Sequence, residues 1–83
     1  EAEDGAAELH APMPAGATVA DLLERLAKAA SGKTKCVLDP ERGTLRPEFL
    51  LTLDGRFLEK ARFSTTALQE GDVVEVFPVP TGG

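Results

Sequence analysis

The sequence predicts an α+β fold in which one main helix packs against one face of a mixed sheet. Three observations predict it. Apolar residues at helical spacing follow a capping motif at Thr18, an Asp54-Gly55 pair joins two apolar runs, and a further apolar run at 73–77 lies near the end of the chain. The 83 residues, of which 42% are hydrophobic, are enough for a single domain with a modest core.

The main helix is predicted over residues 18–31. Thr18 is a good N-cap, and Asp21 completes a capping box that also suits the positive end of the helix dipole. Ser31-Gly32 predicts the stop, with Gly32 as a left-handed C-cap. The apolar residues recur on one side only, so we expect the helix to lie across a sheet; they are Val19, Leu22, Leu23, Leu26 and Ala30.

Before and after the helix, the pattern of apolar and polar residues predicts secondary structure less strongly. Residues 6–12 predict a short strand in which Leu9 and His10 point to opposite faces. Residues 33–47 predict a loop with a brief extended piece at 36–38, because two prolines and a glycine interrupt the segment.

The second half of the chain predicts a hairpin and a final strand. The apolar runs 48–53 and 56–58 are joined by Asp-Gly, which is the strongest short-range hairpin signal. Residues 60–69 predict a connection with a single helical turn at 65–68. The final strand is predicted at 73–77. If Val74 and Val76 face inward there, Val73, Glu75 and Phe77 face outward, where Phe77 either packs over the sheet end or docks a partner.

Charge and composition exclude several classes of function. The net charge is −5, and the nine basic residues are scattered, so we expect a partner with a basic surface rather than nucleic acid. No apolar run approaches the roughly 18 residues of a membrane span, and no basic-then-apolar leader opens the chain. We therefore expect a soluble, cytoplasmic protein without membrane contact.

An intrinsic active site is not expected. The single cysteine, Cys36, and the single histidine, His10, belong to no catalytic motif, and together they cannot make an internal disulfide or a closed metal site. Cys36 is predicted to be a small packed side chain and His10 a surface or half-buried strand residue. No bound cofactor and no metal are expected.

The last residues carry the distinctive chemistry. Pro78 and Pro80 fix φ and remove two backbone donors, so we expect strand pairing to stop and an extended arm to begin. The predicted division is a domain at 1–77 and a tail at 78–83. The tail ends on two glycines, whose lack of a Cβ lets the backbone pass through a narrow channel.

The reactive group of this tail is the α-carboxylate of Gly83. A carboxylate becomes a good electrophile once ATP adenylates it. Attack by sulfur would then give a thiocarboxylate and hence a sulfur carrier, whereas attack by a partner's cysteine would give a thioester and hence a protein modifier. A third possibility is a plain binding module with an incidental Gly-Gly end.

Residues 68–83 resemble the C-terminus of a known family. Their pattern, Leu-x-x-Gly-Asp-x-Val-x-x-x-Pro-x-x-x-Gly-Gly, is similar to that of ubiquitin-like sulfur carriers of the MoaD/ThiS type. Phe77-Pro78 before Thr81-Gly82-Gly83 is most similar to small subunits of molybdopterin synthase. The start of the helix at 14–23 and the hairpin turn at 53–56 extend the resemblance over residues 6–83.

The resemblance implies a β-grasp fold and a carrier rather than an enzyme. Gly83 would be adenylated by a ubiquitin-activating-type adenylyltransferase that uses ATP, and then become a thiocarboxylate. The implied acceptor is the large subunit of molybdopterin synthase; sulfur acceptors for thiamine thiazole, cysteine, tRNA or natural-product thiolation, and protein modification through Gly83, are the alternatives. The implied tail and partner-binding residues are Gly82, Thr81, Pro80, Val79, Pro78 and Phe77.

The chain departs from the family at its start. Family members open with an apolar strand in the middle of the sheet, and residues 1–5 offer none. Either the strand is lacking, or another segment or chain supplies it. Without it, we expect an unpaired edge at 73–77 and self-association through that edge.

Overall fold

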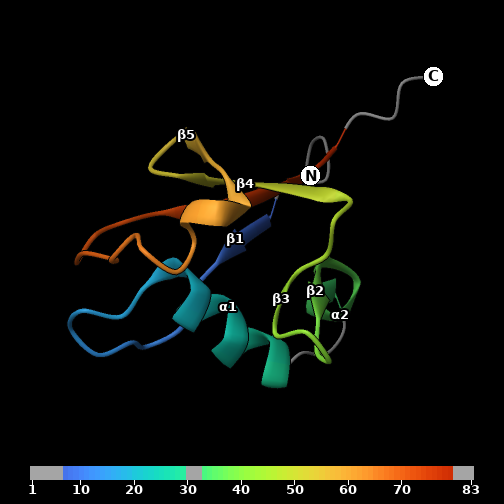
Figure 1. Cartoon of the computed structure of the whole chain (residues 1–83), viewed down its shortest axis with the longest axis horizontal. Helices are drawn as coiled ribbons and strands as arrows, with labels where there is room; N and C mark the ends of the chain where they lie inside the picture. The colour runs from blue at the N-terminus through green and yellow to red at the C-terminus, as the bar shows by residue number, and fades with distance from the viewer. Residues whose placement is uncertain (1–6, 30–32, 80–83) are drawn as a thin grey trace.

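The computed structural model describes residues 7–29 and 33–79 (Figure 1). In chain order the elements are β1 (Ala7–Leu9), α1 (Val19–Lys28), α2 (Lys33–Val37), β2 (Leu38–Asp39), β3 (Thr44–Leu45), β4 (Phe49–Leu53), β5 (Arg56–Leu58), the 3-10 helix η2 (Lys60–Arg62) and β6 (Val74–Pro78). The predictions for residues 1–5, for the Gly32 cap and for residues 80–83 lie outside the described residues.

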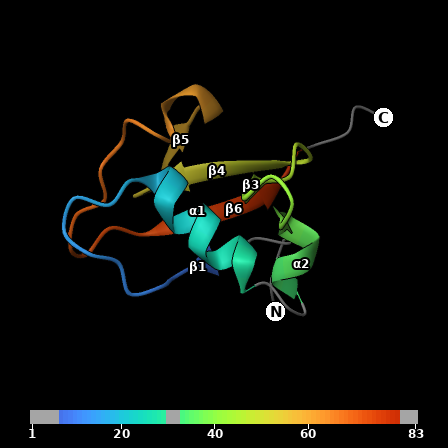
Figure 2. The same cartoon turned by 60° about the horizontal axis from the view of Figure 1, so that its bottom comes forward.

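Four strands form one sheet in the order β1-β6-β4-β5, and each of these neighbouring pairs is antiparallel. Helix α1 crosses one face of this sheet, and the two-stranded sheet β2–β3 lies beside it (Figures 1 and 2). The α+β class and the predicted hairpin at Asp54-Gly55 are therefore confirmed, whereas the described sheet is antiparallel throughout instead of mixed. The turn suits this pair, because both Asp54 and Gly55 have positive φ.

Strand β6 is paired on both sides, so the expected open edge is not there. Val74 and Val76 pair with Leu9 and Ala7 of β1, while the other side of β6 pairs with β4 along its length. Self-association through this edge was expected only if no strand covered it, and in the described part of the chain β1 covers it. The β1 ladder has three residue pairs and the β4 ladder has five.

The core lies between the sheet and α1. Of the predicted apolar stripe, Val19, Leu22 and Leu23 are buried and Leu26 is half-buried, while Ala30 lies outside the described residues. Ala27, which was not predicted, is also buried. These buried residues of α1 pack in one cluster with buried residues of the two sheets and the connection, namely Val37, Leu38, Leu45, Leu51, Phe63, Val74 and Val76. The face of the large sheet that carries Leu51, Val74 and Val76 is therefore its inner face, toward α1, and none of the described helices of eight or more residues covers the opposite face.

The capping box at the start of α1 is confirmed. The Asp21 backbone N–H donates to Thr18 Oγ1 at 3.2 Å, and the Thr18 N–H donates to the Asp21 carboxylate at 2.9 Å. The helix ends at Lys28, earlier than predicted, because Ala29 leaves the helical conformation with φ −100° and ψ 14°.

Replacing Thr18 by alanine is expected to lower the free energy of unfolding by about 1 kcal/mol, because one helix N–H loses its acceptor. Chemical denaturation followed by circular dichroism measures the change. Thr34→Ala is the matched control, since Thr34 makes no side-chain hydrogen bond within the described residues. Equal losses in the two variants would contradict a specific role for the cap.

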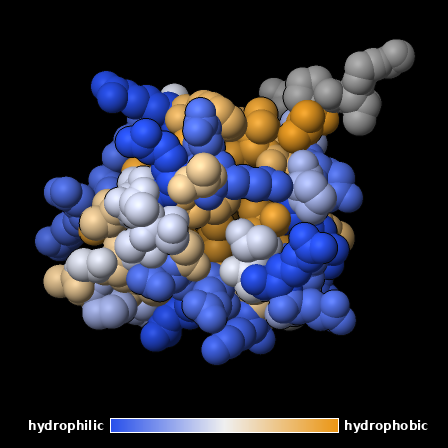
Figure 3. Space-filling view, in the orientation of Figure 1, coloured by the Kyte–Doolittle hydropathy of each residue, from blue (hydrophilic) through white to orange (hydrophobic). Residues whose placement is uncertain are grey.

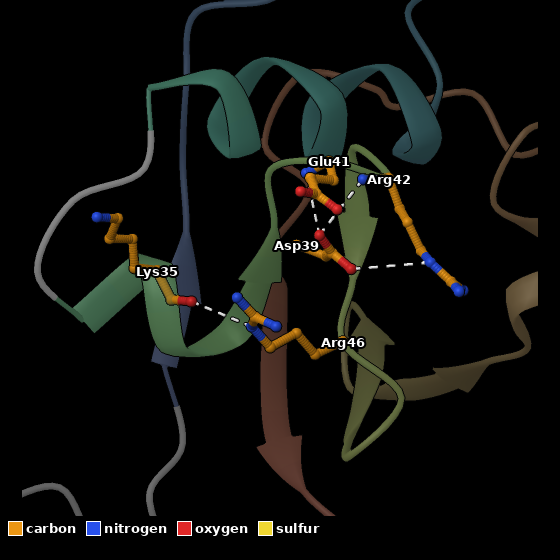
Figure 4. A network of polar contacts seen from close by, with 5 residues as sticks. All are labelled: Lys35, Asp39, Glu41, Arg42 and Arg46. Carbon is orange, nitrogen blue, oxygen red and sulfur yellow. Dashed lines mark hydrogen bonds and ion pairs between the residues drawn. The ribbon is translucent and has the colours of Figure 1, made fainter.

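The prediction of a loop at 33–47 is wrong in most of its length. Residues 33–37 form α2, and β2 pairs with β3 across a turn in which Asp39 Oδ1 accepts from the N–H groups of Glu41 and Arg42. Arg46 Nε donates to the Lys35 carbonyl at 3.1 Å and so ties the hairpin to the helix (Figure 4). Cys36 is exposed on α2, not packed as expected.

The connection between β5 and β6 also differs from expectation. Its helical turn is η2, at Lys60–Arg62, instead of 65–68. Residues 66–68 run alongside the start of α1: Val19 N–H donates to the Thr66 carbonyl, and Leu68 N–H donates to the Ala17 carbonyl at 2.7 Å. These bonds fix the connection against the helix.

Candidate functional site

The site is built on β6, the strand that leads into the C-terminal tail. Val74 and Val76 are 3% and 0% exposed, so their side chains face the core. Strand alternation then turns Val73, Glu75 and Phe77 to the outer face, as predicted. Because β6 is held between two neighbours, the point at which the chain leaves the sheet is fixed.

Apolar side chains gather on this outer face near the end of β6. Phe77 lies opposite Leu50 of β4, and both are half-buried. Phe57 of β5, opposite Thr52 on the same face, is 60% exposed, and Val73 is 37% exposed. Figure 3 shows hydrophobic residues along the top of the molecule, beside the point where the chain leaves β6. We call Leu50, Phe57 and Phe77 the outer patch; Val73, which precedes the start of β6, is not part of it.

Two carboxylates share this face with the outer patch. Glu8 of β1 lies directly opposite Glu75 of β6, and His10 Nε2 lies 3.7 Å from the Glu8 carboxylate. Like charges in register on neighbouring strands repel. The outer face therefore combines apolar surface with negative charge, which suits a partner that carries basic groups around an apolar contact.

Pairing with β4 continues beyond the predicted end of the final strand. Pro78 lies opposite Phe49, and the Val79 N–H donates to the Glu48 carbonyl at 2.7 Å. The expectation that Pro78 stops strand pairing is wrong. Glu75 and Phe77 of β6, and Val79 after it, direct their backbone N–H and C=O groups toward β4. The missing donor of Pro78 points to the β1 side, so no bond to β4 is lost.

Of the predicted tail residues, the structure describes three. Phe77 is half-buried on the outer face, Pro78 is exposed, and Val79 is half-buried and bonded to Glu48. Thr81 lies beyond them, with Pro80, Gly82 and Gly83, outside the described residues, so their roles and the boundary of the tail stay predictions. Leu50, which faces Phe77, was missed because residues 49–51 are all apolar and hide the alternation.

The two residues considered for catalysis or redox chemistry lie apart in the fold. His10 is exposed next to β1, and Cys36 is exposed on α2. Within the described residues, no three side chains of the metal-ligating types come together. No helix in the described ranges is long and apolar enough to cross a membrane.

One comparison with known proteins gives a match. A model of the ThiS family matches residues 2–83, which is nearly the whole chain. No curated protein and no solved structure matches. The match confirms the β-grasp fold that the C-terminal pattern implied, and it includes the tail.

Proposed function

Because the chain belongs to the ThiS family of ubiquitin-like sulfur carriers, we propose that its working group is the Gly83 carboxylate, converted to a thiocarboxylate that donates sulfur. Proteins of this family are small carriers rather than enzymes, and they work with adenylating enzymes and sulfur acceptors. The observation that carries the proposal is the order of the chain: β6, an inner strand of the sheet, ends at Phe77-Pro78, and only Val79, Pro80 and Thr81 separate it from Gly82-Gly83.

The proposed chemistry has two steps. A Gly83 carboxylate oxygen attacks the α-phosphorus of ATP on a ubiquitin-activating-type adenylyltransferase, forming the acyl-adenylate and releasing pyrophosphate. Sulfide from a sulfur donor then attacks the acyl carbon; a C–S bond forms, the C–O bond to AMP breaks, and AMP leaves, so that the thiocarboxylate remains. The carrier itself binds no cofactor in this scheme, and because the activation consumes ATP we expect it to act in the cytoplasm.

The reach of the tail supports a role for the outer patch in docking. Val79 is anchored to Glu48, and four residues beyond it span at most roughly 14 Å when fully extended. An enzyme that acts on Gly83 must therefore contact the domain close to the end of β6. Phe77 and Leu50 are the apolar residues there, and we expect them to contact both the adenylyltransferase and the acceptor.

For the acceptor, we propose the large subunit of molybdopterin synthase. Phe77-Pro78 before Thr81-Gly82-Gly83 supports this choice, because it resembles small subunits of that enzyme. The family also serves other acceptors, so thiamine thiazole synthesis is the nearest alternative. Gly82 would permit threading into the acceptor, and Pro80 would keep the tail extended.

Two acceptors distinguish these pathways. Thiocarboxylated chain is incubated either with the large subunit of molybdopterin synthase and its pterin precursor, or with a thiazole synthase and its substrates. We expect sulfur to leave Gly83 only in the first mixture, as followed by the mass of the intact chain and the appearance of the dithiolene product. Transfer in the second mixture alone would refute the molybdopterin assignment but leave the carrier chemistry standing.

A further inference from the structure

An open groove lies at the end of the molecule opposite the Pro78 end of β6. It has a volume of about 750 Å³ and runs between residues 10–16, which follow β1, and residues 67–72, which precede β6. In Figures 1 and 2 these two loops lie together at the left, far from the Pro78 end of β6. The proposed sulfur chemistry does not use this groove, which we call the loop groove.

The loop groove combines an apolar lining with acidic charge. Its apolar side chains include Leu9, Met13, Leu22, Leu68 and Val74. Among the described residues that line it, the carboxylates are Glu70 and Asp72, and there is neither lysine nor arginine. The described lining also contains His10. Even beside this imidazole, two carboxylates leave a net negative potential for an apolar segment that enters the loop groove, so basic residues next to that segment would lower the energy of binding.

Hydrogen bonds hold both walls of the loop groove in place. Leu68 N–H donates to the Ala17 carbonyl at 2.7 Å, and Ala17 N–H donates to the Pro14 carbonyl at 3.1 Å, so the two loops are tied together. Within the wall formed by residues 67–72, Asp72 Oδ2 accepts a hydrogen bond from the Gln69 N–H at 2.8 Å. Gly71 completes this turn with a φ of 89°. Binding of a ligand therefore costs little conformational entropy in these loops.

We propose that the loop groove binds a peptide segment of a partner protein in which apolar residues are flanked by lysine or arginine. The lining of Leu9, Met13 and Leu68 fits the apolar residues, and Glu70 on the rim pairs with the basic ones. Because the groove is open along one side, it fits part of a chain lying across it better than an enclosed small molecule. The inference goes beyond sulfur transfer, because a partner bound there does not cover Phe77, at the other end of β6.

The test uses the full chain, labelled with ¹⁵N, and two blocked probe peptides. One has the sequence Gly-Lys-Leu-Phe-Lys-Gly, and the other replaces both lysines with glutamate. We expect saturable chemical-shift changes at residues 9–16 and 67–74 with the basic peptide and none with the acidic one. Glu70→Lys should weaken binding of the basic peptide roughly threefold to tenfold.

Glu41→Lys is the matched control, because it makes the same change in charge at an exposed position outside the loop groove. It should leave the affinity within about twofold, because Glu41 is exposed and does not line the loop groove. Three outcomes would overturn the inference: no change at these loops with the basic peptide, equal binding of the two peptides, or equal weakening by Glu70→Lys and Glu41→Lys.

Discussion

Deletion of Gly83 is expected to abolish both adenylation and sulfur transfer. The reacting carboxylate would move back by one residue, and the remaining chain would end short of the adenylating site. One additional alanine after Gly83 should have the same effect, because the new carboxylate would extend beyond the position at which ATP is attacked. Pyrophosphate exchange with a competent adenylyltransferase measures the first step, and transfer to an acceptor measures the second.

Thr81→Ser is the control for this experiment, since it alters the tail but keeps its length and its terminal carboxylate. It should retain most of the activity. Unchanged partner binding and biological activity after deletion of Gly83 would instead indicate a plain binding module. Conjugates of higher mass that survive reductant in cell lysate would favour the protein-modifier alternative.

Phe77→Asp is expected to lower kcat/KM for adenylation by about 30-fold to 1000-fold, as for other central interface residues. The new carboxylate would stand opposite Leu50 and on the same face as Glu75 and Glu8, so docking would lose an apolar contact and gain buried negative charge. Steady-state kinetics with a saturating concentration of ATP measure the change, and thermal unfolding shows whether the domain remains folded.

Val73→Asp is the matched control for Phe77→Asp. Val73 lies on the same face at the other end of the strand, and the variant adds the same charge. Its kcat/KM should fall by less than about fivefold, the range of a peripheral contact. Similar losses in the two variants would show that docking does not centre on the end of β6.

The parts of the fold that could be predicted from sequence are those with strong local signals. The side chains of Thr18 and Asp21 each accept a hydrogen bond from the other residue's backbone N–H within one helical turn. Asp54 and Gly55 adopt the positive φ values that their hairpin requires. Both motifs are stabilised by neighbours in the chain, so tertiary contacts do not override them.

The segment 33–47 could not be predicted in the same way. Helix α2 has five residues, too few for a helical period to be visible, and β2 and β3 have two residues each. Their stability comes from packing: Leu38 and Leu45 are buried against α1, and Arg46 binds the Lys35 carbonyl. None of these contacts leaves a pattern in the local sequence.

The candidate site was predicted in part. Alternation along β6 places Phe77 outward, but the course of the strand past Pro78 depends on which neighbour each backbone group faces. That direction follows from the register with β4, in which Val79 donates to Glu48. The pairing of Glu8 with Glu75 likewise depends on β1 lying directly beside β6, which no local motif indicates.

The measurement that tests the central claim most directly is intact mass spectrometry of the chain after incubation with ATP, an adenylyltransferase and a sulfur donor. We expect a mass gain equal to the exchange of one oxygen for one sulfur, located at Gly83 by fragmentation. An unchanged mass with adenylyltransferases that activate other members of the ThiS family would contradict the proposed carrier chemistry. The chain would then share only its fold with the family.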